Sequence, residues 1–192
     1  MYLRHWVYYY LARFRLMLKQ HEGAAHAYRL AFAANPRFAL AAAGLGFLQA
    51  TRGHYAEAAQ AFAEALRINP GNADVWFDLG YVQQQQQQFD EALGSFRRAV
   101  ELKPGIDRAW YGMGLIHSAR HDYRQAAEMF RKAVALQPMN PHAYYELAMA
   151  CHALGNLDQV RKIIKQVSEF DPKMTQQLIR ETGQLPEGAA RR

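Results

Sequence analysis

Apolar residues recur along this chain at helical spacing, in short segments that are separated by polar breaks. One segment places Trp76, Leu79 and Gly80 on a single face, and the next, after a glutamine-rich break, does the same with Phe89 and Phe96. A period near 3.6 residues predicts amphipathic α-helices. The pattern therefore predicts an all-α chain built from helices that are joined in pairs by tight turns.

The helix pairs repeat at a fixed interval of 34 residues. Five prolines mark the interval: Pro36, Pro70, Pro104, Pro138 and Pro172. Alignment on these prolines produces a column of small residues: Ala12, Gly46, Gly80, Gly114 and Ala148. Helices approach each other closely only where one of them offers a small residue and a bulky neighbour fills the space. The column of small residues therefore predicts the points at which the two helices of each pair are in contact.

Within one repeat, residues 76–104 carry Trp, Leu-Gly, Phe-Asp-Glu-Ala, Phe, Ala and Pro in that order, which resembles the tetratricopeptide repeat signature. The resemblance extends over residues 5–174 and implies a right-handed α-α superhelix, a solenoid of helix-turn-helix repeats. The first and last repeats depart from the pattern, as terminal repeats do because only one side is covered. The five expected repeats are residues 5–38, 39–72, 73–106, 107–140 and 141–174.

The residues after the fifth repeat predict one more helix. Asp171 followed by Pro172 is typical of a helix N-cap and first turn, and Met174, Leu178 and Ile179 form one apolar stripe. We expect residues 172–182 to form a C-terminal capping helix that covers the last repeat. Residues 183–192 have little to bury and are expected to form a flexible tail.

Charge and composition narrow the functional classes. The net charge is +6, and residues 1–38 carry six Lys or Arg against one acid, so the excess is local rather than spread along a groove for nucleic acid. The lone Cys151 excludes an internal disulfide and favours a reducing, cytoplasmic location. No uncharged run approaches the roughly 20 residues of a membrane span, so we expect no integral membrane segment.

The sequence offers little for catalysis. His117 and His121 are four residues apart, but no HExxH pattern or cysteine pair completes a metal site. There is no glycine-rich phosphate loop and no serine nucleophile motif. We therefore expect neither an enzyme nor a bound metal or cofactor.

The resemblance also implies where a partner binds, because members of the family bind peptides or partner helices on a concave face lined by the first helix of each repeat. The inward residues are implied at the second, fifth, sixth, ninth and twelfth positions of each repeat. The expected peptide-binding residues are Trp6, Tyr9, Arg13, Phe47, Asp74, Phe77, Asp78, Tyr81, Gln84, Arg108, Tyr111, Leu115, His142, Tyr145 and Met149.

The ninth position of each repeat carries the functional hypothesis. Phe47, Tyr81, Leu115 and Met149 occupy it, although packing alone does not require an apolar residue there. We expect the four side chains to come together on the inner wall, because a contiguous exposed apolar strip usually marks an interface. The expected function is a non-catalytic scaffold or adaptor that binds an apolar peptide or helix with bulky side chains.

Other functions stay open at the sequence level. The aromatic residues of the first helix, Trp6, Tyr9 and Tyr10, either cover an open end of the solenoid or form a self-complementary patch that makes a homodimer. The arginines of that helix would also suit an anionic membrane surface. A further alternative is a secretion-type chaperone that shields a hydrophobic segment of an exported protein.

Overall fold

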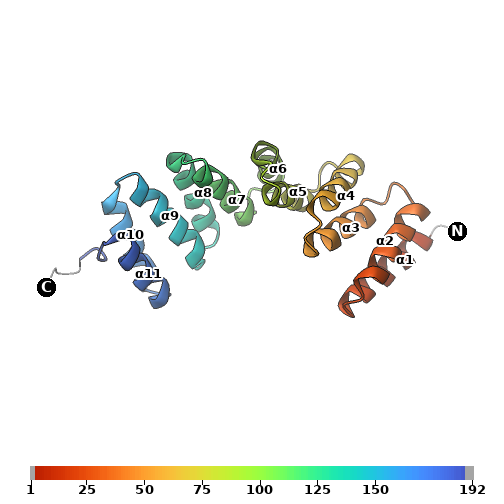
Figure 1. Cartoon of the computed structure of the whole chain (residues 1–192), viewed down its shortest axis with the longest axis horizontal. Coiled ribbons are helices and arrows are strands. Elements are labelled where there is room, and N and C mark those ends of the chain that lie inside the picture. Colours follow the sequence, from red (N-terminus) through yellow and green to blue (C-terminus); the bar gives the residue numbers. More distant parts are fainter. Residues whose placement is uncertain (1–2, 189–192) are drawn as a thin grey trace. The chain divides into compact units, whose positions relative to one another are not determined.

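The computed structural model describes residues 3–188, and within them the chain forms eleven α-helices and no strand (Figure 1). The first ten helices form five consecutive pairs, and the eleventh follows the last pair. The all-α class expected from the sequence is confirmed. The helices are α1 (Arg4–Met17), α2 (His21–Ala34), α3 (Ala39–Thr51), α4 (Tyr55–Ile68), α5 (Ala73–Gln85), α6 (Phe89–Leu102), α7 (Asp107–Ala119), α8 (Tyr123–Leu136), α9 (Pro141–Ala153), α10 (Leu157–Ser168) and α11 (Pro172–Thr182).

The chain divides into two compact units, Met1–Lys103 and Pro104–Arg192. The first unit holds α1 to α6 and the second holds α7 to α11. In both, the two helices of a pair pack against each other, and where a further pair follows in the same unit its first helix packs against the second helix of the pair before. Among the described residues, no helix combines the length and the apolar character that crossing a bilayer requires.

Glycines and phenylalanines fit together inside the pairs α3–α4, α5–α6 and α7–α8. A methyl group added at Gly80 would lie 2.7 Å from the ring of Phe96, and one added at Gly46 would lie 2.7 Å from the ring of Phe62. Both rings are buried. The two helices therefore touch at the column of small residues, as the sequence predicts, and the aromatic ring occupies the space that a side chain would need.

The turn inside each pair has the same form whether or not it contains glycine. Gly53 and Gly155 adopt positive φ angles of 77° and 71°, and Gln87 adopts 61° at the corresponding position. The turn after α5 closes with a hydrogen bond of 2.9 Å from the Gln88 amide to the Gln83 carbonyl. The glutamine run thus continues α5 and then forms the same turn as the other pairs. Because Gln87 carries a side chain, its left-handed backbone conformation is strained.

Tryptophan fixes the connection between successive pairs. The indole nitrogen of Trp76 donates to the Pro70 carbonyl at 2.8 Å, and that of Trp110 donates to the Pro104 carbonyl at 3.1 Å. Each bond joins the start of a first helix to the turn that precedes it. The signature tryptophan therefore fixes the turn that leads into its own helix.

Helix α11 covers the end of the second unit. The Asp171 carboxylate accepts a hydrogen bond of 2.9 Å from the Met174 amide, and Pro172 occupies the first turn. Leu178 is completely buried in a cluster with residues of α8, α9 and α10. The helix ends at Gly183, which has a φ of 66°. The apolar stripe predicted for this helix therefore packs against the core of the second unit.

The expected flexible tail spans residues 183–192, of which 189–192 lie outside the described residues. In the described part, the side chain of Arg161 on α10 donates to the Gln184 amide oxygen at 3.1 Å. The Glu187 amide donates to the Arg161 carbonyl at 3.3 Å. These two bonds hold the segment after α11 beside α10.

Candidate functional site

The expected binding residues all lie on the first helices of the pairs, and none of them is buried. They form two sets, one on α1, α3 and α5 of the first unit and one on α7 and α9 of the second. The exposed members are Arg13, Phe47, Asp74, Tyr81, Arg108 and His142. The partly buried members are Trp6, Tyr9, Phe77, Asp78, Gln84, Tyr111, Leu115, Tyr145 and Met149.

Two aromatic side chains stand out in the first unit. Phe47 on α3 is 54% exposed and Tyr81 on α5 is 42% exposed. They occupy the same position in successive repeats, and α3 and α5 are in contact. Burial of such large apolar side chains would be favourable, so the pair is the centre of the candidate site.

Helix α5 also carries polar residues at helical spacing from Tyr81. The Asp74 carboxylate pairs with the Lys103 ammonium group at 3.2 Å, and both side chains are exposed, so the ion pair itself contributes little to stability. Asp78 and Gln84 are partly buried on the same helix. The site therefore combines apolar anchors with groups that can accept or donate hydrogen bonds.

Phe77 packs inside its helix pair in addition to its place among the expected binding residues. Its ring lies 5.9 Å from the ring of buried Phe96 on α6. Tyr111 repeats the arrangement in the second unit, 5.6 Å from buried Phe130 on α8. Replacing either side chain would disturb the interior of a helix pair as well as its surface.

The aromatic residues of α1 also pack within the fold. The Trp6 and Tyr9 rings lie 4.7 and 5.4 Å from the ring of Phe38, in the connection that leads to α3. The Arg13 guanidinium lies 6.0 Å from the Tyr9 ring, within range of a cation–π contact. The Trp6 and Tyr9 rings cover Phe38, and Tyr10, stacked on Trp6, is exposed.

In the second unit the fold itself occupies part of the expected face. Tyr111, Leu115 and Tyr145 pack against the cluster that α11 closes. The Tyr145 hydroxyl donates to the Glu181 carboxylate on α11 at 2.7 Å. This bond raises the pKa of the Tyr145 hydroxyl and lowers that of the Glu181 carboxyl. Leu115 is thus less available to a partner than Phe47 or Tyr81.

One titratable group among the inward positions was not among the expected binding residues. Glu146 on α9 is partly buried, and burial raises the pKa of its carboxyl while nearby His142 opposes the rise. Its place at the sixth position of the repeat was the signal available in the sequence.

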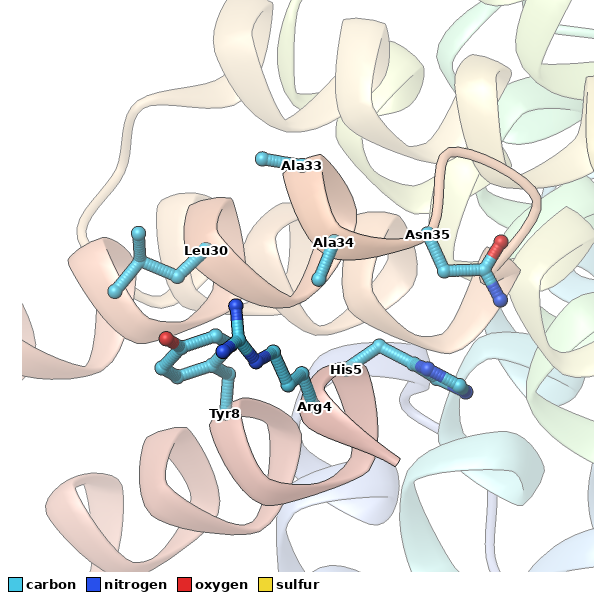
Figure 2. Close-up of a pocket in the computed structure, with 7 residues that line it drawn as sticks. All are labelled: Arg4, His5, Tyr8, Leu30, Ala33, Ala34 and Asn35. Carbon is cyan, nitrogen blue, oxygen red and sulfur yellow. The ribbon is translucent and has the colours of Figure 1, made fainter. Parts of the chain in front are cut away.

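A cleft between α1 and α2 was also not predicted. It has a volume of about 680 Å³. In Figure 2 the side chains of Arg4 and Tyr8 lie side by side and point from α1 toward Leu30 of α2. The repeat pattern does not indicate it, because the cleft borders a side of the first pair that no earlier pair covers within the described residues. Its lining residues are Arg4, His5, Tyr8, Leu30, Ala33, Ala34 and Asn35.

The groups usually needed for metal or thiol chemistry are not assembled in the described part of the chain. Residues 3–188 hold no group of three or more His, Cys, Asp or Glu side chains that could bind a metal ion. Cys151 is buried, and burial raises the pKa of its thiol, which makes it a poor nucleophile. His117 lies 3.4 Å from the Asp122 carboxylate across the turn after α7, so its role is in that turn.

Comparison with protein families identifies the repeats. Two family models, both described as tetratricopeptide repeat, match residues 49–114 and 118–178 in one case and residues 11–73 in the other. A search of curated proteins found no match.

Solved structures with the same fold cover nearly all of the chain. A structure of the MamA protein is 19% identical with a TM-score of 0.82, and covers 99% of this chain and 98% of its own. YrrB, described as a tetratricopeptide repeat protein with an unusual peptide-binding site, is 22% identical with a TM-score of 0.77, and covers 90% of each chain. PilF of Pseudomonas aeruginosa is 21% identical with a TM-score of 0.78, and covers 94% of this chain and 85% of its own. At these identities the likeness establishes the solenoid fold.

Proposed function

Because this chain belongs to the tetratricopeptide repeat family, whose members are generally non-catalytic scaffolds for protein interactions, we propose that it is an adaptor that binds an apolar peptide on α3 and α5. The observation that carries the proposal is the exposure of Phe47 and Tyr81 at equivalent positions of neighbouring helices. A solvated surface does not need two large aromatic side chains there, whereas a bound peptide would bury them. The description of YrrB as having a peptide-binding site supports a peptide as the class of ligand for this fold.

The magnitudes define what the peptide must supply. Burying about 100 Å² on each aromatic anchor at roughly 25 cal/mol per Å² contributes about 2.5 kcal/mol per anchor. Association costs at least about 4 kcal/mol, and micromolar binding needs about 8 kcal/mol net. Two anchors alone do not reach that value. The proposal therefore requires that the peptide also bonds to polar groups of α5, and partly buried Gln84 is the first candidate.

The proposal is tested by the double variant Phe47→Ala/Tyr81→Ala on an array of peptides with bulky apolar side chains. We expect wild-type protein to bind a subset of the array and the variant to lose at least about tenfold in affinity for that subset, the equivalent of 1.4 kcal/mol. The matched control is Leu102→Ala in the same unit, because the exposed fraction of Leu102, 41%, nearly equals the 42% of Tyr81.

Phe77 and Tyr111 are less suitable positions for this test, because their rings pack on Phe96 and Phe130. Unchanged peptide binding by Phe47→Ala/Tyr81→Ala, with an intact helical circular dichroism spectrum, would exclude these two side chains as anchors.

A further inference from the structure

Helix α1 carries a second apolar surface, on the side turned away from the rest of the first unit. Leu3, Val7, Leu11, Phe14 and Leu18 are all exposed, with Val7 at 63% and Phe14 at 54%. Their spacing of four, four, three and four residues places them on one stripe along the helix. We call these five residues the end face. Exposed Tyr10 and Met17 widen it on one side.

The end face occupies positions that are covered by a helix elsewhere in the same unit. Counting two repeats onward, Val7, Leu11 and Phe14 correspond to residues 75, 79 and 82 of α5. Those three α5 side chains are buried against Phe62 and Leu66 of α4, the second helix of the preceding pair. On α1, no helix within residues 3–188 covers the corresponding positions. The shape of the end face is therefore suited to one more helix.

The same relation holds in the second unit. Leu147 and Ala150 of α9 correspond to Leu11 and Phe14, and both are buried in a cluster that includes Phe130 of α8. A surface with this register thus receives a helix in each unit. The end face therefore has the same residue positions as the surfaces of α5 and α9 that pack against the preceding helix.

The charges beside the end face select the kind of helix. Helical spacing places Arg4 and Arg15 along one edge of the stripe, where the Arg15 guanidinium also donates to the Gly23 carbonyl of α2 at 3.2 Å. The single acid of residues 3–38, Glu22, pairs with Arg52 of the next repeat at 2.6 Å. That edge of the end face therefore carries two positive charges, and a helix with carboxylates beside its apolar stripe is complementary to it.

Self-association fits this surface poorly. Two end faces brought together by a two-fold axis would place the arginines of one copy against those of the other. A head-to-tail contact would need the outer side of the last pair, but α11 covers that side and its Leu178 is completely buried there. These two arrangements of a second copy are therefore less favourable than a partner helix with carboxylates.

We propose that the end face binds an amphipathic helix of a partner protein, whose apolar stripe is flanked by carboxylates. The site is separate from the peptide site on α3 and α5, so the two proposals stand independently. Apolar packing supplies most of the affinity, and the two arginines at its edge select acidic partners over basic ones and make binding weaker at high salt.

The test uses full-length protein and a stapled helical peptide with the sequence of residues 55–68, because α4 covers the corresponding positions of α5. The acidic probe carries Ala56→Glu, Ala63→Glu and Arg67→Glu, and the basic probe carries Ala56→Lys and Ala63→Lys, all at exposed positions beside the apolar stripe of α4. Fluorescence anisotropy should show that the acidic probe binds at least about tenfold more tightly than the basic one. The variant Val7→Gln/Phe14→Gln should weaken the acidic probe by at least about tenfold, and Phe47→Ala/Tyr81→Ala should not change it.

Two further measurements on the same variants distinguish other occupants. Vesicles containing phosphatidylserine are used for sedimentation binding, and light scattering follows the mass of the protein across a concentration series. We expect wild-type protein and Val7→Gln/Phe14→Gln to behave alike in both. Vesicle binding that is lost in the variant would assign the end face to anionic lipid, and a larger mass that is lost would assign it to a second copy. Either result, or equal binding of the two probes, overturns the proposal.

Discussion

In the pairs α3–α4, α5–α6 and α7–α8, a phenylalanine ring packs directly against a glycine of the facing helix, which leaves no room for a side chain there. Gly80→Ala would gain about 1 kcal/mol of helix propensity but would force a methyl group to 2.7 Å from the Phe96 ring, at a cost of about 1–3 kcal/mol. We expect a net loss of stability in urea unfolding. The matched control is Gly94→Ala on α6, where an added methyl group meets nothing within 4 Å, and it should gain about 0.5–1 kcal/mol. Equal effects at the two sites would contradict this packing account.

The turn after α5 contains a residue with a side chain in the left-handed region of backbone conformation. Gln87 has a φ of 61°, a region that costs a residue with a side chain about 1–2 kcal/mol. Gln87→Gly removes this strain but adds about 0.4–1 kcal/mol of unfolded-state entropy. The net result should be a gain of about 0.5–1 kcal/mol in the free energy of unfolding. Gln85→Gly, at the last residue of α5, should instead lose about 0.5 kcal/mol. A loss at both positions would show that the turn is unstrained.

Glu146 makes stability depend on pH. Burial raises the pKa of its carboxyl in the folded protein above the ordinary value of 4.5. Between these two values the folded state binds more protons than the unfolded state, so the contribution of this group to stability falls as pH rises through the window. Glu146→Gln removes that fall. Chemical unfolding at pH 4 and pH 7 should show that the free energy of unfolding of the variant increases relative to that of wild type as pH rises. A difference that does not depend on pH would contradict the burial of the Glu146 carboxyl.

At the scale of single elements, α11 is the helix whose contribution can be measured most cleanly. Leu178 of α11 is completely buried, so Leu178→Ala should cost about 2–5 kcal/mol in the free energy of unfolding. Leu136→Ala, at an exposed position of α8, should stay within about 0.5 kcal/mol of wild type. A small loss at Leu178 would mean that α11 contributes little to the second unit.

The helices could be predicted from the sequence because each pair repeats the same local rules. The period placed Gly80 against a bulky neighbour, and Asp171 with Pro172 marked the start of α11. What covers a given side chain was harder to predict. Trp6 meets Phe38 and Tyr145 meets Glu181 through contacts that lie outside the repeat pattern.

The end face illustrates the same difficulty on α1. Its apolar spacing is visible in the sequence. However, the α5 residues at the positions that correspond to Val7, Leu11 and Phe14 are buried in the core, whereas these three are exposed. The sequence pattern alone cannot distinguish a covered stripe from an exposed one. Only the burial of each residue in the structure separated the two cases.

At the scale of the whole molecule, the repeats form a scaffold with two candidate docking surfaces in the first unit. Repeat arrays are stabilised by contacts between neighbouring units, so a surface substitution in one pair leaves the others intact. Substitutions at Phe47 and Tyr81 and those at Val7 and Phe14 should therefore affect separate partners. Loss of both binding activities in either variant would indicate a change in folding instead.

The measurement that most directly tests the adaptor function is photo-crosslinking in cells with a photoreactive phenylalanine placed at Tyr81. The control protein carries the same group at Leu102, which is 41% exposed in the same unit compared with 42% for Tyr81. We predict a crosslink at position 81 to a polypeptide segment rich in bulky apolar side chains, weakened by Phe47→Ala, and no such crosslink at position 102. Equal crosslinking at the two positions, or none at position 81, would contradict peptide binding on α3 and α5.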